Sequence, residues 1–209
     1  MKTRRVVGLL VLVVSALALS SCNMVLGWFG LGDIVIDNFE SDSSVKWSGI
    51  WDSVGSTVSS IARTGSTSYE GDYSLQIDYT AVSVTDSWGA GVVRQLDEGP
   101  LDFTKVESIW FQLNPNGYTG YFNVQLTDSD GTIYSTWVNA ADNHLVFSGS
   151  GWMEFNVEMK DLAIVDWGEG SIPGFDLTRV DTFELIFEDS TATVYLDDIT
   201  ADWRLFGPR

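Results

Sequence analysis

The sequence predicts an all-β protein built as a β-sandwich or barrel, and three observations support this. From Ile34 onward, apolar residues alternate with polar ones over short runs, and no stretch keeps helical periodicity beyond two turns. Gly, Asn and Asp separate these runs, and the four prolines lie outside them. Roughly 170 residues follow the N-terminal segment, enough for one domain with a full hydrophobic core.

The alternation predicts about ten antiparallel strands. We expect them at residues 34–39, 57–62, 73–80, 89–96, 107–113, 121–127, 132–138, 152–159, 183–188 and 192–200. Short strands at such spacing, with turn residues between them, are typical of sandwiches and barrels. The segment DSDG at 128–131 has the composition of a tight hairpin turn.

Residues 108–128 are expected to form a hairpin, in which two strands pair around a turn and share one apolar face and one unusual polar face. The inward positions are Ile109, Phe111, Leu113, Phe122, Val124 and Leu126. The opposite positions carry aromatic rings and amides, namely Trp110, Gln112, Tyr121, Asn123 and Gln125. Aromatic rings stack on the C–H faces of sugars and amides bind their hydroxyls, so this face is predicted to bind a saccharide. Cross-strand aromatic pairing that only covers the sheet is the alternative.

Two segments of thirteen residues repeat the same pattern. LDFTKVESIWFQL at 101–113 aligns without a gap with FDLTRVDTFELIF at 175–187. In each, an Asp-x-Thr turn precedes a strand, and such turns use the Asp side chain to bind nearby backbone. The repeat predicts two similarly placed central strands and a structural role for Asp102 and Asp176.

The first 22 residues are expected to be a lipoprotein signal. Three basic residues precede an apolar run at 6–19 that is too short for a comfortable membrane span. The sequence Leu19-Ser20-Ser21-Cys22 then resembles the lipobox of bacterial lipoproteins, in which the signal peptide is removed and the cysteine carries diacylglycerol. Cys22 is the only cysteine of the chain. An ordinary signal peptide with a chance cysteine is the alternative.

The predicted organisation is a signal peptide at 1–21, a lipidated cysteine and tether at 22–33, and a β-sandwich at 34–209. A lipid on Cys22 would anchor the protein outside the cytoplasm of a bacterium without spanning the membrane. Asn23 stands where an Asp would suggest retention at the inner membrane, which favours the outer membrane or cell surface. A single cysteine allows no disulfide within the chain.

The charge of the protein restricts its partners. Removal of Lys2, Arg4 and Arg5 with the signal peptide leaves eight basic residues against 29 acidic ones, a net charge of −21. Such a surface repels nucleic acid, anionic lipid head groups and acidic polysaccharides. Neutral ligands and cations remain, so a neutral glycan is the predicted partner, together with the membrane through the lipid.

Four segments in order resemble a known family. They are DNFES at 37–41, YEGDYSLQIDY at 69–79, GWMEFNVEMKDL at 151–162 and VYLDDI at 194–199. Their order and spacing resemble the galactose-binding-like jelly-roll domains, particularly family 11 carbohydrate-binding modules and the related domain of complex I intermediate-associated proteins. The resemblance covers residues 34–203. It implies a jelly-roll β-sandwich whose first and last strands are neighbours.

The resemblance also implies a structural calcium ion where those strands meet. The ligands it implies are Asp37, Glu40, Asp72 in the loop that begins at Glu70, and Asp197 or Asp198. Hard oxygen ligands gathered from distant segments suit Ca²⁺, which takes six to eight of them. The alternative is that Asp197 and Asp198 only alternate along the strand, one capping a turn and one facing solvent.

Few residues suggest catalysis. His144 is the only histidine and is predicted to be an exposed loop residue, which excludes multi-histidine metal sites and leaves no recognisable triad. Glycosidases use two carboxylates, and two pairs share a strand face: Glu154 with Glu158, and Glu184 with Glu188. Pairs along one strand are more often solvated or cation-bound, so a protein without catalytic activity is predicted.

The function predicted from these features is non-catalytic binding of a neutral polysaccharide or oligosaccharide by a lipid-anchored module. The predicted contacts are Trp110, Gln112, Tyr121, Asn123, Gln125 and Glu154. One alternative is a structural or assembly lipoprotein that binds an envelope protein through the same face. Another is a jelly-roll glycosidase or lyase.

Overall fold

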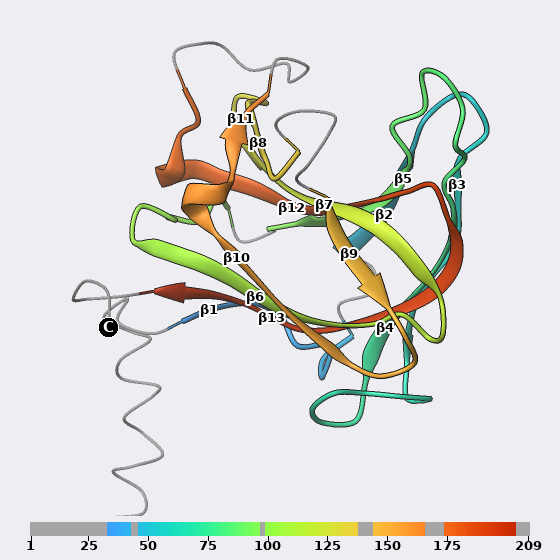
Figure 1. The fold of residues 1–209 in the computed structure, drawn as a ribbon. Coiled ribbons are helices and arrows are strands. Elements are labelled where there is room, and N and C mark those ends of the chain that lie inside the picture. Colours follow the sequence, from blue (N-terminus) through green and yellow to red (C-terminus); the bar gives the residue numbers. More distant parts are fainter. Residues whose placement is uncertain (1–32, 43–45, 97–98, 138–143, 166–173, 204–209) are drawn as a thin grey trace, which may run out of the picture.

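Two antiparallel sheets pack face to face to form a sandwich (Figure 1). The computed structural model describes residues 33–42, 46–96, 99–137, 144–165 and 174–203. The predicted signal peptide, the lipidation site at Cys22 and the tether up to residue 32 lie outside these ranges. No helix within the described ranges is long and apolar enough to cross a bilayer.

Sheet A is built around the long strand β13. Its path is β10 (Met153–Glu158), β6 (Val106–Asn114), β13 (Thr191–Trp203), β4 (Ser74–Thr80) and β3 (Thr57–Thr64). Strand β1 (Ile34–Asp37) also pairs with β13, through Ile34 opposite Ala201. The first and last strands are therefore neighbours, as the family resemblance implies.

Sheet B has β7 and β12 at its centre. Its path is β11 (Ala163–Ile164), β8 (Ile133–Ser135), β7 (Thr119–Asp128), β12 (Val180–Glu188), β5 (Ala90–Gln95) and β2 (Trp47–Trp51), and β9 (Leu145–Ser148) also pairs with β7. Two short 3-10 helices, η2 (Met159–Asp161) and η3 (Leu177–Arg179), connect strands.

The core between the sheets is rich in phenylalanine. The alternation along β6 and β7 places the predicted inward residues at full or nearly full burial. Phe111 of sheet A meets Phe122 and Phe183 of sheet B, with ring centroids 5.9 Å and 6.2 Å away. These edge-on contacts join the two layers without any covalent crosslink.

The sequence repeat has the predicted structural role. Asp102 Oδ1 accepts hydrogen bonds from the N–H of Thr104 at 2.9 Å and its hydroxyl at 2.6 Å, and Asp176 Oδ1 does the same with Thr178. These bonds from threonine hold the pKa of both carboxyls below its ordinary value. The strands that follow, β6 and β12, are each nine residues long and lie inside sheets A and B respectively.

The ten predicted strands are all present, and the structure adds three. The additional strands are β2, β9 and β11, of five, four and two residues. The tight turn at 128–131 is also confirmed, with the Gly131 N–H donating to the carbonyl of Asp128 at 3.0 Å. Short strands carry too few alternating positions to be recognised from sequence.

The expected pairing of the two strands in 108–128 is wrong. Strand β6 pairs with β10 and β13 in sheet A, whereas β7 pairs with β8, β9 and β12 in sheet B. The connection at 115–118 therefore carries the chain from one sheet to the other. Because the apolar faces of both strands point into the same core, their polar faces lie on opposite sides of the molecule.

Candidate functional site

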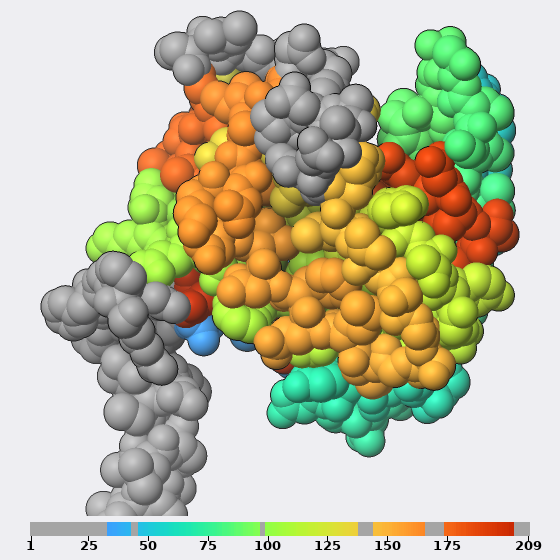
Figure 2. Space-filling model, viewed as in Figure 1, coloured from blue at the N-terminus to red at the C-terminus, as the bar shows by residue number. Residues whose placement is uncertain are grey.

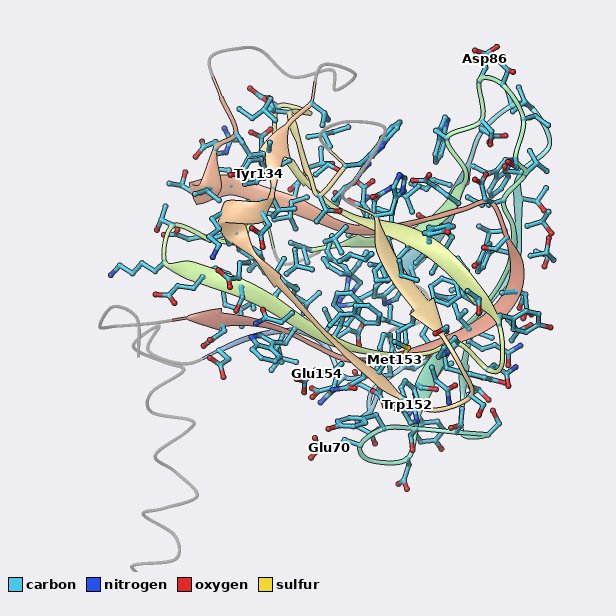
Figure 3. All side chains as sticks on the ribbon, in the orientation of Figure 1. Glu70, Asp86, Tyr134, Trp152, Met153 and Glu154 are labelled. Atoms are coloured by element: carbon cyan, nitrogen blue, oxygen red, sulfur yellow. The ribbon has the colours of Figure 1, made fainter. Side chains whose placement is uncertain are left out.

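The predicted saccharide platform is divided between the two outer faces. Trp110, Gln112 and Glu154 come together on sheet A, where the Gln112 amide donates to Glu154 at 3.4 Å. They line a shallow groove of about 360 Å³ with four carboxylates in its lining: Asp33, Glu154, Asp198 and Asp202. Figure 3 labels Glu154, Glu70 and Trp152 in the lower part of the molecule, on the sheet A side. Tyr121, Asn123 and Gln125 lie on sheet B.

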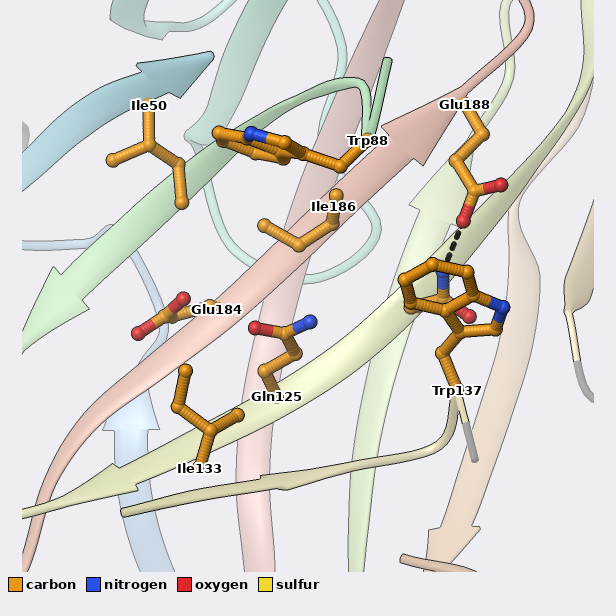
Figure 4. Close-up of a pocket in the computed structure, with 9 residues that line it drawn as sticks. Ile50, Trp88, Gln125, Ile133, Trp137, Glu184, Ile186 and Glu188 are labelled. Carbon is orange, nitrogen blue, oxygen red and sulfur yellow. Dashed lines mark hydrogen bonds between the residues drawn. The ribbon is translucent and has the colours of Figure 1, made fainter. Parts of the chain in front are cut away.

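A larger cleft occupies the outer face of sheet B. It encloses about 520 Å³, within the range of oligosaccharide-sized pockets. The described residues that line it are Ile50, Trp88, Asn123, Gln125, Ile133, Trp137, Glu184, Ile186 and Glu188. Figure 4 shows Gln125 and Ile186 near the middle, Trp88 and Trp137 on different sides, and Glu184 and Glu188 far apart.

Strand register produces the floor of the cleft. Ile50, Gly91, Ile186 and Asn123 lie in one row across β2, β5, β12 and β7. A Cβ on Gly91 would lie 2.3 Å from the Leu185 carbonyl oxygen and 2.7 Å from the Ile186 side chain. Gly91 therefore lets the Ile186 side chain lie low in this row and keeps the centre of the cleft open.

Two buried amides face the cleft with unused hydrogen-bonding capacity. Gln125 is only 7% exposed, and its side chain forms no hydrogen bond with the described residues. Asn123 is 1% exposed, and its Oδ1 has no hydrogen-bond partner, whereas its Nδ2 donates to Glu188. Burying polar atoms without partners costs free energy, so such atoms indicate a place that a ligand completes.

The two carboxylates of the cleft have different surroundings. Glu184 Oε1 accepts from the hydroxyls of Thr127 at 2.9 Å and Thr182 at 2.7 Å. Glu188 lies 3.3 Å from His144 Nδ1 and also accepts from Asn123. Burial raises the pKa of Glu188, against the effects of His144 and Asn123. His144, predicted to be an exposed loop residue, is instead partly buried at the edge of the cleft.

A network around Asp52 holds Trp88. Asp52 accepts the Ser87 hydroxyl at 2.6 Å and the Gly89 N–H at 3.2 Å, so it fixes the residues on both sides of Trp88. Burial opposes ionisation of Asp52, but hydrogen bonds from Ser87, Ser56 and the backbone outweigh it and hold its pKa far below the ordinary value. The two loops joined in this way, at 52–56 and 81–89, project together beyond the sheets (Figure 2).

The opposite side of the cleft is aromatic. The Trp137 ring lies 6.5 Å from the imidazole of His144, which in turn lies 5.9 Å from Tyr121 in an edge-on arrangement. The backbone N–H of Trp137 donates to Ser135 Oγ at 3.0 Å and so ties the residue to the end of β8. Tyr121 is 46% exposed and extends this aromatic side beyond the cleft itself.

Sequence reasoning missed Trp88, Trp137 and the isoleucines of the cleft. The two tryptophans lie in loops, where no periodicity tells which way a side chain points. The isoleucines belong to short strands or to outward positions, and their grouping depends on strand order. The one available signal was the pair Glu184 and Glu188 on one strand face.

The predicted calcium ligands fall into two groups in the structure: Asp37 lies inside the sandwich, whereas Glu40 and Asp197 both accept hydrogen bonds from the loop at 69–73. Asp37 accepts hydrogen bonds from Trp47 Nε1 at 2.9 Å and Arg94 Nε at 3.1 Å inside the sandwich. It therefore links β1 of sheet A to β2 and β5 of sheet B. Its Oδ2 thus accepts from the N–H donors of a buried ion pair and of Trp47, and calcium ligation by Asp37 stays a prediction.

The other predicted ligands hold a loop through hydrogen bonds. Glu40 Oε1 accepts the N–H groups of Asp72 and Tyr73 at 3.0 Å and 3.1 Å. Asp197 Oδ2 accepts those of Tyr69 and Glu70 at 2.8 Å and 3.3 Å. Among the residues that the structure describes, no three acidic, histidine or cysteine side chains are arranged to hold a metal ion. Calcium takes six to eight oxygen ligands, and its binding at these residues stays a prediction.

The fold has counterparts among solved structures. A family 11 carbohydrate-binding module from Clostridium thermocellum, in complex with a β-1,3-1,4-mixed-linked tetrasaccharide, matches with a TM-score of 0.65 and 18% identity over 84% of this chain and 98% of that chain. The family 11 module of a cellulosomal cellulase of the same organism gives 0.63 and 17% over 85% and 98%. An exo-β-agarase gives 0.54 and 13%, over 85% of this chain and 25% of that chain.

Sequence comparisons add no closer relative. No protein-family model matches the chain, and no curated protein is significantly similar to it in sequence. The likeness is therefore carried by the arrangement of strands, and it spans nearly all of the family 11 modules. The chain has the jelly-roll fold of family 11 carbohydrate-binding modules.

Proposed function

We propose that this protein binds a glycan chain, without catalysis, in the cleft of sheet B. The observation that carries the proposal is the pair of buried amides, Gln125 and Asn123, whose open hydrogen-bonding atoms face a cleft lined by two tryptophans. The neighbours in fold are carbohydrate-binding modules, one of them in complex with a tetrasaccharide, which supports glycan binding at the level of the fold.

In the proposed mechanism, aromatic rings stack on the sugar rings and amides form hydrogen bonds with the sugar hydroxyls. Trp88 and Trp137 offer flat apolar faces on which the C–H faces of sugar rings stack. Gln125 supplies both a donor and an acceptor to sugar hydroxyls, and Asn123 supplies an acceptor. A charge of −21 on the mature chain disfavours acidic glycans, which leaves uncharged or basic ones.

The arrangement of the carboxylates favours binding over hydrolysis. Glu184 and Glu188 lie four residues apart on β12, so their Cα atoms are about 13 Å apart. Glycosidases place their two carboxyl groups about 5–9.5 Å apart across the bond that is cleaved. Here Glu184 is held by Thr127 and Thr182, while Glu188 is held by Asn123 and His144 at the far end of the strand.

Membrane attachment is part of the proposal. A diacylglycerol on Cys22 would hold the domain at an extracytoplasmic surface, with the outer membrane or cell surface favoured. The eleven residues between Cys22 and Ile34 reach at most about 36 Å when extended, so binding would take place close to the membrane. Labelling with a radioactive fatty acid, lost in Cys22→Ser, tests this part separately.

The binding proposal is tested with the purified full-length protein in detergent on an array of uncharged glycans. Gln125→Ala should weaken binding about tenfold, because it removes a buried donor and acceptor. Gln112→Ala is the matched control, since this buried amide lies on the outer face of sheet A. Equal losses in the two variants, or loss only in Gln112→Ala, would contradict the assignment to sheet B.

A blank array would support the alternative of an envelope assembly protein. In that case a stoichiometric protein partner should be captured from the envelope and lost in Tyr121→Ala. Release of reducing ends from a glycan that binds would instead support a glycosidase.

A further inference from the structure

The cleft of sheet B carries negative charge with little cationic compensation. Of the nine described residues that line it, two are glutamates and none is lysine or arginine. Glu184 is held only by the hydroxyls of Thr127 and Thr182, which are neutral, and both bonds go to Oε1. Its Oε2 accepts no hydrogen bond from the described residues. Glu184 therefore presents a carboxylate oxygen that a ligand can use.

Glu188 places a second carboxylate at the other end of the same strand. Residues 184, 186 and 188 share the outward face of β12, with Ile186 between the two glutamates (Figure 4). The charged and titratable groups packed near Glu188 are His144 beside β9 and the neighbouring Asp189. Glu188 therefore has an imidazole beside it, whereas Glu184 has no basic side chain bonded to it among the residues that the structure describes.

The lining suits a ligand that is flat, partly apolar and positively charged. A protonated amine forms charge-assisted hydrogen bonds to carboxylates, which are stronger than those of a hydroxyl. An ammonium group close to Trp88 or Trp137 gains a further attraction to the ring face. Gln125 and Asn123 need hydroxyl or amide partners, which a simple polyamine lacks. Amino sugars combine all three properties.

We propose that the cleft selects an amine-bearing glycan, an oligomer that contains glucosamine units, over its uncharged counterparts, and that Glu184 binds the amine. This inference rests on the proposed function and narrows the ligand class of the same cleft. The Cα atoms of Glu184 and Glu188 are about 13 Å apart, so the two carboxylates contact different sugar units of a chain.

Three tetrasaccharides that differ only at the C2 position test the proposal. They are the tetramers of glucosamine, N-acetylglucosamine and glucose, all β-1,4-linked, titrated calorimetrically into the full-length protein in detergent at pH 6.5. We expect the glucosamine tetramer to bind about tenfold tighter than either uncharged tetramer. Glu184→Gln should reduce this ratio to about threefold or less, because it keeps the shape and removes the charge.

A polycation binds weakly to any protein as acidic as this one, whose full sequence has a net charge of −18, so the controls must separate this nonspecific attraction from binding in the cleft. Glu158→Gln removes an exposed carboxylate from sheet A and should leave the preference for glucosamine unchanged. An equal loss in both variants indicates attraction by net charge only and overturns the proposal. Spermine that binds as tightly as the glucosamine tetramer, and depends on Glu184, also overturns it in favour of a polyamine site.

The remaining outcomes separate this inference from the proposed function. Equal affinity for all three tetramers, lost in Gln125→Ala, overturns the preference for amines and leaves glycan binding intact. No binding of any tetramer at millimolar concentration overturns the preference for amines, whereas the array of uncharged glycans decides the proposed function.

Discussion

At the scale of single residues, the carboxylates that resemble metal ligands in the sequence accept hydrogen bonds from N–H groups in the structure. Asp37, Glu40 and Asp197 are acidic residues in segments that are far apart along the chain, as calcium ligands are. The structure gives each of them N–H donors instead, from arginine, tryptophan or loop backbone. Residue type and position predicted that these carboxylates join distant segments, but could not tell which donors they meet.

Asp37 should behave as half of a buried ion pair. Asp37→Ala leaves the Arg94 guanidinium in the sandwich without its carboxylate, and we expect a loss of about 3–5 kcal/mol in the free energy of unfolding. Urea denaturation measures this loss, which should be the same with calcium or with chelator. The double variant Asp37→Leu, Arg94→Met should be more stable than Asp37→Ala, because no charge is left buried alone. A loss seen only when calcium is present would support the predicted metal site.

Asp198 provides a test of pH dependence. Burial, with a contribution from Glu70, raises the pKa of Asp198, so the folded state holds its proton more tightly than the unfolded state does. Its stabilising contribution is therefore present below the unfolded pKa and is lost as the pH rises through the folded pKa. Asp198→Asn cannot ionise, so it avoids this loss of stability. It should raise the melting temperature by about 1–2 °C at pH 7 and leave it unchanged near pH 3.

Asparagine suits this position because the backbone at Asp198 has φ of +46°, a region that asparagine adopts readily. Asp86→Asn is the control, since Asp86 has φ of +70° and lies exposed at a loop tip (Figure 3). Calcium added to the wild-type protein should not change its melting temperature at pH 7 or near pH 3. A decrease in the stability of Asp198→Asn in calcium alone would show that a cation binds there.

At the scale of elements, loops supply the two tryptophans of the cleft, and one buried carboxylate holds the loop that carries Trp88. The acceptor oxygens of Asp52 join the turn after β2 to the end of the loop before β5. The alternation of residues along strands says nothing about such loops. This is why the strands were predicted well and the aromatic sides of the cleft were not.

Asp52→Ala should therefore affect both stability and binding. The N–H groups of Val54, Ser56 and Gly89 lose their acceptor, and we expect a loss of about 2–3 kcal/mol in the free energy of unfolding. Glycan affinity should also fall about fivefold at 25 °C, although Asp52 does not line the cleft, because Trp88 is no longer held. Calorimetric titration of protein that circular dichroism shows to be folded checks this.

The matched control is Asp102→Ala, which removes an exposed carboxylate from a similar turn on another connection. It should leave affinity unchanged. An Asp52→Ala protein that melts early yet binds normally would show that the network stabilises the fold without positioning Trp88.

At the scale of the whole molecule, alternation predicted the sandwich but not the assignment of strands to sheets. Strands β6 and β7 each have one apolar face, and both faces point into the core, as expected. Pairing was expected from a short connection at 115–118 with Asn and Gly, the residues of hairpin turns. Such a connection can equally well lead the chain from one sheet to the other. Because it does so here, the residues of the predicted platform lie on two different sheets. Trp110 and Gln125 are close in sequence and lie on opposite surfaces.

The central place of β13 also has consequences for how the protein is made. This strand pairs with β1, β4 and β6, all of which are synthesised before it. Sheet A therefore has no complete centre until residues 191–203 have left the ribosome, and one hydrogen-bonding edge of β6 has no partner strand until then. Sandwiches rich in such distant pairings fold in about milliseconds to seconds, more slowly than helical bundles. Late assembly of the sheet centre would suit the export proposed above, because a narrow translocation channel passes unfolded chains.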